Sequence, residues 1–127
     1  MILVDTSIWA ELIKGRIHLK EPDQLLWFRT TGPVLQEVLQ GLRPGRESEA
    51  FKESFLAIPR LCDPLTCDLF AQAAEIYREG RRHGYTIRSS TDCLIAAIAI
   101  ENGIPVWHRD RDFNRIAAFT PLRIFVP

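Results

Sequence analysis

The feature that most constrains the fold is an apolar run of eight residues, from Cys93 to Ile100. It lies within a predicted helix over residues 89–103, which Gly103 ends. A helix that is apolar on all faces has to be covered on all sides. The run is far too short to span a bilayer. We therefore expect a central helix enclosed by other elements of a layered domain.

Strand-like and helix-like segments alternate along the rest of the chain. This alternation predicts an α/β fold around a mostly parallel sheet, in which a site forms beyond the carboxyl ends of the strands. Thr6 or Ser7 is expected to cap the first helix and Thr66 the longest one. Residues 25–28 fit a strand or a helix equally well. The expected strands are residues 2–5, 104–108 and 122–127, with a weaker candidate at 60–65, and the expected helices are 8–15, 33–42, 46–58, 66–84, 89–103 and 113–119.

Composition bounds the function mainly by what it excludes. The 127 residues suit one domain, 1–127, and the formal net charge is zero, so any attraction to nucleic acid has to be local. Three cysteines without a C-x-x-C pair predict neither a disulfide framework nor a zinc site. The N-terminus has no basic segment followed by a long apolar one, so no signal peptide is expected, and the free thiols suit the cytoplasm.

Four acids occupy positions where a site could form. Asp5 and Asp110 follow predicted strands, Asp92 opens the central apolar helix, and Glu37 flanks the apolar face of another helix. Each acid alone also fits a structural role, as a helix cap, a solvated helix acid or a turn residue. Together they form a repulsive cluster that needs a positive partner, and the sequence has no lysine beyond Lys52. A hard divalent cation, Mg²⁺ or Mn²⁺, is the simplest partner.

Asp110 and Asp112 are expected to differ in role although they lie only two residues apart. Asp110 comes directly after the strand and can project into the pocket. Asp112 precedes the last predicted helix with the spacing of an N-cap, and we expect its side chain to accept from the amide of Asn114 or Arg115. Loss of Asp112 should therefore cost stability more than activity.

Four stretches of the sequence resemble the PIN domain family, and in particular the small VapC-type toxins of prokaryotic toxin–antitoxin pairs. The stretches are "VDTSIW", "PVLQEVLQGLR", "STDCLIAAIAIENG" and "HRDRDF", and the resemblance covers essentially the whole chain. Similar proteins often carry Thr or Ser two residues before the last acid, where this chain has His108. The departure concerns hydrogen bonding around the site rather than its metal ligands.

The resemblance implies a three-layer α/β/α sandwich and a single-strand-specific endoribonuclease. It implies that Asp5, Glu37, Asp92 and Asp110 are the catalytic acids that bind Mg²⁺ or Mn²⁺. We expect Thr6, Ser7 and Asp112 to lie around these acids as supporting residues. It also implies a homodimer and a cognate antitoxin protein that blocks the site. Candidates for contacts with RNA phosphates are Arg43, Arg46, Arg81, Arg82 and Arg88.

Three alternatives remain open at this level. The chain fits an RNA-processing or structure-specific PIN nuclease that has no antitoxin, and it fits an inactive RNA-binding or interaction domain. A phospho-receiver signalling module is disfavoured, because it needs a lysine on a late strand.

Large apolar side chains in residues 25–28, with Phe51 and Phe55, predict an exposed groove for an antitoxin segment.

Overall fold

The computed structural model describes every residue from Met1 to Pro127 and contains a three-stranded parallel sheet in the order β2-β1-β3. Ile2 pairs with Phe28 across the first two strands, and Val4 pairs with Trp107 across the first and third. The predicted α/β fold with a parallel sheet is confirmed. The strands are β1 (Ile2–Val4), β2 (Phe28–Arg29) and β3 (Val106–Trp107).

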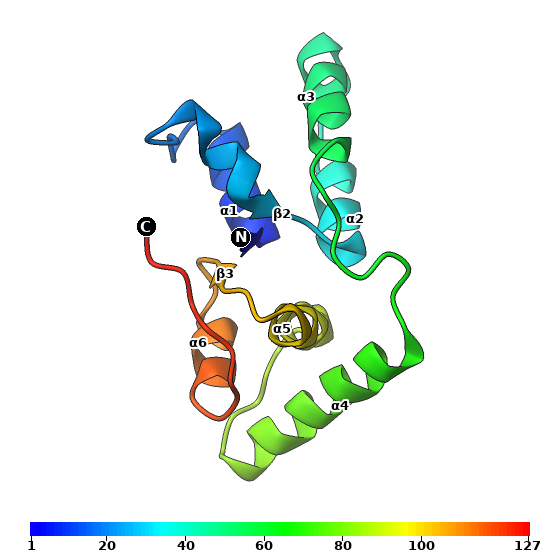
Figure 1. The fold of residues 1–127 in the computed structure, drawn as a ribbon, viewed down its shortest axis with the longest axis vertical. Coiled ribbons are helices and arrows are strands. Elements are labelled where there is room, and N and C mark those ends of the chain that lie inside the picture. The colour runs from blue at the N-terminus through cyan, green and yellow to red at the C-terminus, as the bar shows by residue number, and fades with distance from the viewer.

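Helices cover both sides of the sheet. In Figure 1, α1, α2 and α3 gather above the strands, and α4, α5 and α6 lie below them. This arrangement is the predicted three-layer sandwich. The helices are α1 (Thr6–Ile13), α2 (Gly32–Gln40), α3 (Arg46–Leu56), α4 (Cys67–Arg82), α5 (Ser90–Asn102) and α6 (Arg111–Ala117), with a 3-10 helix η1 (Pro22–Trp27).

Helix α5 is the central element, as its uniform apolarity predicts. Every residue from Asp92 to Ala99 is buried, and α5 packs between the sheet and the long helix α4 (Figure 1). Gly103 ends α5 in the left-handed conformation, with φ of 64°, and the chain turns there into β3. No helix of the fold combines the length and the apolarity that crossing a membrane would require. The central helix thus serves as core and places Asp92 at the sheet's carboxyl edge.

Two of the four strand predictions were wrong in extent. Residues 60–65 and 122–127 each contribute one isolated parallel bridge, Thr30 with Arg60 and Val106 with Ile124. Cys62 has φ of 53°, which an extended strand cannot continue through. Residues 25–28 take both predicted forms, because η1 ends at Trp27 and β2 begins at Phe28.

Two of the predicted helix caps were also wrong. Asp5, rather than Thr6 or Ser7, caps α1, and Asp110, rather than Asp112, caps α6. Both aspartates keep the extended backbone of the chain that leaves a strand, with ψ of 159° and 133°, which is the conformation an N-cap needs. The cap at Thr66 on α4 is confirmed. Strand end and helix cap therefore coincide at each site acid that follows a strand.

Candidate active site

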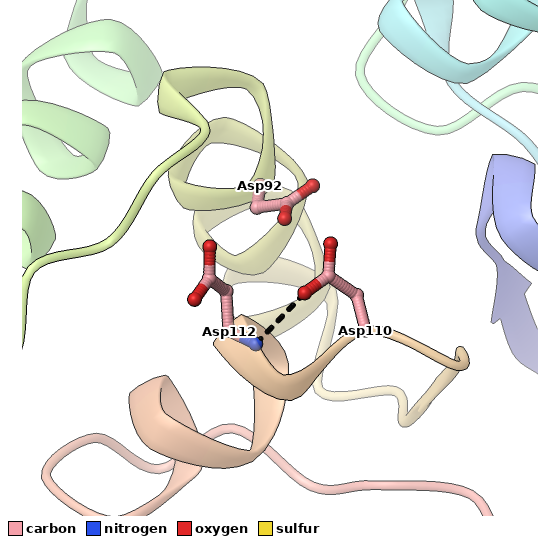
Figure 2. A group of neighbouring side chains, drawn as sticks. All are labelled: Asp92, Asp110 and Asp112. Carbon is pink, nitrogen blue, oxygen red and sulfur yellow. Dashed lines mark hydrogen bonds between the residues drawn. The ribbon is translucent and has the colours of Figure 1, made fainter.

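Three carboxylates meet at the carboxyl edge of the sheet. Asp92, Asp110 and Asp112 each offer one oxygen, and these oxygens lie within 4.8 Å of one another. Figure 2 shows Asp92 reaching down from the first turn of α5 towards Asp110 and Asp112, which stand at the start of α6. The sequence analysis predicted that Asp92 and Asp110 share a pocket, and they lie together here. It predicted that Asp112 caps the last helix instead, whereas Asp112 lies in the same cluster.

Asp92 is a buried acid with a strongly raised pKa. Only 8% of the residue is exposed, and its Oδ2 atom has no hydrogen-bond partner. Burial raises the pKa of Asp92 to about 8, and the charges of Asp5, Asp110 and Asp112 add to the rise. The cluster therefore lacks compensating positive charge at Asp92, although that carboxylate is buried.

Asp110 is fixed by hydrogen bonds on both of its sides. Its Oδ1 accepts from the amide of Asp112 at 3.0 Å, and its own amide donates to Nδ1 of His108 at 2.9 Å (Figure 2 shows the first contact). Because Nδ1 accepts, a neutral His108 carries its proton on Nε2, which is buried and unpartnered. Burial is the largest effect on His108 and lowers its pKa despite Asp5 and Asp110. A neutral His108 that orients the backbone of Asp110 fits a structural role.

Asp112 is buried and tied to two segments, contrary to its predicted role as an N-cap. It is 3% exposed, its Oδ2 accepts from the amide of Arg88 at 3.0 Å, and its Oδ1 pairs with Nη1 of Arg115 at 3.2 Å. The contact with Arg88 joins residues 24 positions apart, so local spacing could not reveal it. The one local indication that Asp112 shares the pocket with Asp110 is the D-x-D pattern, in which the two aspartates are two residues apart.

A hydrogen-bonded chain positions Asp5 opposite this cluster. Ser7 donates to Oδ2 of Asp5 through its hydroxyl at 2.6 Å and its amide at 3.2 Å, and the Ser7 hydroxyl accepts from the amide of Arg109 at 3.1 Å. The chain thus connects the start of α1 to the segment that carries Asp110. The charge of Asp5 also raises the pKa of Asp92, so Asp5 is near enough to repel that carboxylate, although it is not one of the three clustered acids. Ser7 therefore supports an acid as predicted for it.

Glu37 stands at the rim of the pocket rather than inside the cluster. Its side chain is exposed on α2, and partial burial followed by the charge of Asp5 raises its pKa, which the neighbouring Thr6 hydroxyl opposes. Thr6 Oγ1 is itself buried without a hydrogen-bond partner. Glu37 and Thr6 line the same groove, and the role of Glu37 as a metal ligand stays a prediction.

The predicted RNA-contacting arginines lie in three separate places. Arg43 and Arg46 line a groove that also contains Glu37. Arg81 and Arg82 end α4, where Arg82 pairs with Glu75 and Glu79. Arg88 approaches the acids through its backbone amide, which binds Asp112.

The donor set fits a hard divalent cation. All the clustered side-chain donors are carboxylate oxygens, one buried oxygen of Asp92 is unpartnered, and Arg115 neutralises only Asp112. Arg109, beside Asp110 in sequence, turns away to pair with Glu11 at 3.3 Å. No cysteine belongs to the cluster, and burial raises the pKa of the adjacent Cys93 thiol to about 11. The clustered donors are thus carboxylate oxygens alone.

Known proteins share this fold and sequence. The model of the PIN domain family matches residues 2–119. Ribonuclease VapC11 of Mycobacterium tuberculosis is 38% identical over 130 residues, which cover 97% of this chain and 96% of that protein. The structure of VapC20 from M. tuberculosis, described as a sarcin-ricin loop cleaving toxin, has a TM-score of 0.61 and 26% identity over 97% of this chain and 99% of that one. VapBC2 from Rickettsia felis, bound to a promoter DNA fragment, has a TM-score of 0.74 and 18% identity over 98% of both chains.

Proposed function

The chain belongs to the PIN domain family, among its VapC-type members, and we propose that it is a metal-dependent endoribonuclease that cleaves single-stranded RNA as the toxin of a toxin–antitoxin pair. The observation that carries the proposal is the buried, uncompensated carboxylate of Asp92 beside Asp110 and Asp112. The proposal is supported by relatives that are named ribonucleases and that align with this chain over nearly their whole length.

Asp5, Glu37, Asp92 and Asp110 would hold Mg²⁺ or Mn²⁺, and Asp112 offers a further oxygen to the same space. When bound, the cation supplies Lewis-acid stabilisation for the charge that develops on a phosphodiester during hydrolysis. The protein contributes a rigid arrangement of acids. Ser7 orients Asp5, the cap on α6 orients Asp110, and the apolar surroundings of Asp92 limit access of bulk water.

An antitoxin partner is supported by exposed apolar surface at part of the predicted place, since Phe28 and Phe55 are buried in the core instead. Leu25, Leu26 and Trp27 of η1 are 45%, 75% and 59% exposed, and Leu25 also lines a groove of about 520 Å³ against Phe51 of α3. A monomer gains nothing from exposing such a patch, whereas a partner segment would cover it. Several structural neighbours are toxin–antitoxin complexes, which fits this proposal.

A homodimer would use a different face. Phe70 of α4 is a large apolar side chain that is 53% exposed, and it makes α4 the candidate contact between two copies of the chain. The mass of the purified protein in solution tests the dimer directly.

The proposed function is tested by cleavage of a single-stranded RNA pool and a duplex control with Mg²⁺, with Mn²⁺ and with EDTA. Asp92→Asn should abolish metal-dependent cleavage. The matched control is Asp68→Asn, because Asp68 also lies in the first turn of a helix but is exposed. Cleavage that persists in EDTA, or survives in Asp92→Asn, would refute the metal-dependent site.

A further inference from the structure

A second groove starts at the acid pocket and follows α1 towards the turn between α2 and α3. Its volume is about 830 Å³. Thr6, Ala10 and Ile13 line it from successive turns of α1, so it runs along one face of that helix for about two turns. Thr6 is next to Asp5 in sequence, and Glu37 on the opposite wall is electrostatically coupled to Asp5. The groove is therefore continuous with the proposed active site.

Three cations line this groove and are not engaged elsewhere. Lys14, Arg43 and Arg46 contribute to its walls, and none of them takes part in an ion pair. Arg82, by contrast, is held by Glu75 and Glu79 on α4. The chain as a whole has a formal net charge of zero, so this concentration of free positive charge is local.

We propose that this groove binds the RNA segment next to the scissile phosphate, with Arg43, Arg46 and Lys14 contacting its phosphates. The proposal rests on the proposed ribonuclease function. A pocket of acids repels a polyanionic substrate, so productive binding needs positive charge at a nearby, separate place. The three unpaired cations outnumber the two acids, Glu37 and Glu47, that also line the groove. Unpaired arginines can bind phosphates in a bidentate way.

The floor of the groove suits a nucleotide chain rather than phosphates alone. Ala10, Ile13 and Val38 provide apolar surface between the acid end and the basic end. Such surface can contact riboses and base faces of a single strand, which are exposed when the RNA is unpaired. A peptide partner fits less well, because the three unpaired cations favour a polyanion, and the strongly exposed Leu26 and Trp27 lie on η1, outside this groove.

The experiment compares two double variants that remove the same charge. Arg43→Ala/Arg46→Ala alters the groove, and Lys20→Ala/Lys52→Ala alters two exposed lysines that are outside the groove and in no ion pair. Affinity for a labelled single-stranded RNA is measured against salt concentration in an Asp92→Asn background with EDTA. The groove variant should bind about tenfold more weakly, and its salt slope should fall by about 1.4, since each lost phosphate contact on a single strand contributes about 0.7.

Kinetics in the otherwise unaltered protein separate binding from catalysis. The groove variant should raise KM with little change in kcat, and the control variant should match wild type in both. Equal weakening in the two variants, or a fall in kcat alone, overturns the groove proposal. So does a groove variant that binds RNA normally but loses a co-expressed antitoxin, because the groove is then a protein-binding site. If wild type neither binds nor cleaves RNA, the proposed function itself fails.

Discussion

Replacing Asp92 with asparagine should stabilise the metal-free protein, and increasingly so as pH rises. The pKa of Asp92 is raised from 3.8 to about 8, so the folded protein keeps this proton across a range in which the unfolded chain has lost it. Stability contributed by the group is therefore fully present below about pH 4 and is lost as pH rises towards 8. Glu37, whose pKa is also raised, acts in the same direction in both proteins.

The size of the effect follows from the shift. About four pKa units correspond to a ceiling of roughly 6 kcal/mol at about 1.4 kcal/mol per unit. Solvent that reaches the half-buried Asp110 screens part of this repulsion, so we expect a measured difference of about 2–3 kcal/mol between pH 5 and pH 8.5.

Urea unfolding in EDTA at pH 5 and at pH 8.5 measures this difference in unfolding free energy, for wild type and for Asp92→Asn. The wild type should lose stability relative to the variant as pH rises, and Mn²⁺ should restore the wild type far more than the variant. Parallel pH profiles in the two proteins, or an equal gain from Mn²⁺, would refute the reasoning that Asp92 is the uncompensated charge.

Further outcomes are expected for variants around the acid pocket and for a variant of the exposed η1 side chains. Asp112→Ala should cost about 1–3 kcal/mol in unfolding free energy, since it removes a buried side chain that accepts from the partly buried amide of Arg88 and pairs with Arg115. Asp110→Ala should cost less, because the lost cap, about 1 kcal/mol, is offset by relief of repulsion; the opposite order would refute the assigned contacts. His108→Ala should lower the unfolding midpoint yet retain metal-dependent cleavage, and a loss as complete as in Asp92→Asn would make His108 part of the chemistry. Leu26→Ser/Trp27→Ser should reduce binding of a hydrophobic dye and of the antitoxin without changing RNA cleavage, and unchanged dye binding would show that η1 is not the exposed apolar surface.

The sequence predicted the fold where the signal was local and strong. The uniform apolarity of residues 93–100 identified the buried helix, and the short apolar runs identified β1 and β3. It failed where partners decide the structure. The segments 60–65 and 122–127 have strand-like composition, but each makes a single bridge at a sheet edge, and no neighbouring strand extends the pairing.

The site shows the same division between local and long-range information. The positions of Asp5, Asp92 and Asp110 follow from strand ends and a helix start, which the sequence carries. The position of Asp112 depends on the amide of Arg88, which the fold brings to it from the segment before α5. The groove cations depend likewise on how the turn between α2 and α3 lies beside α1. The spacing of residues in the sequence reveals neither the contact of Asp112 with Arg88 nor the position of the turn beside α1.

Cap and ligand, which the sequence presented as competing roles for each acid, are compatible because a carboxylate has two oxygens. Asp5 uses Oδ2 for both bonds from Ser7, and Asp110 uses Oδ1 for the amide of Asp112, so each keeps one oxygen for the pocket. The helix N-termini behind them also favour negative charge, which offsets part of the repulsion between the clustered acids. Asparagine caps a helix as well as aspartate does but ligates a cation poorly. Asp5→Asn should therefore keep the unfolding free energy of wild type and lose metal-dependent cleavage, whereas Asp5→Ala should lose both. If Asp5→Asn is destabilised as much as Asp5→Ala, the charge of Asp5 serves the helix rather than the site.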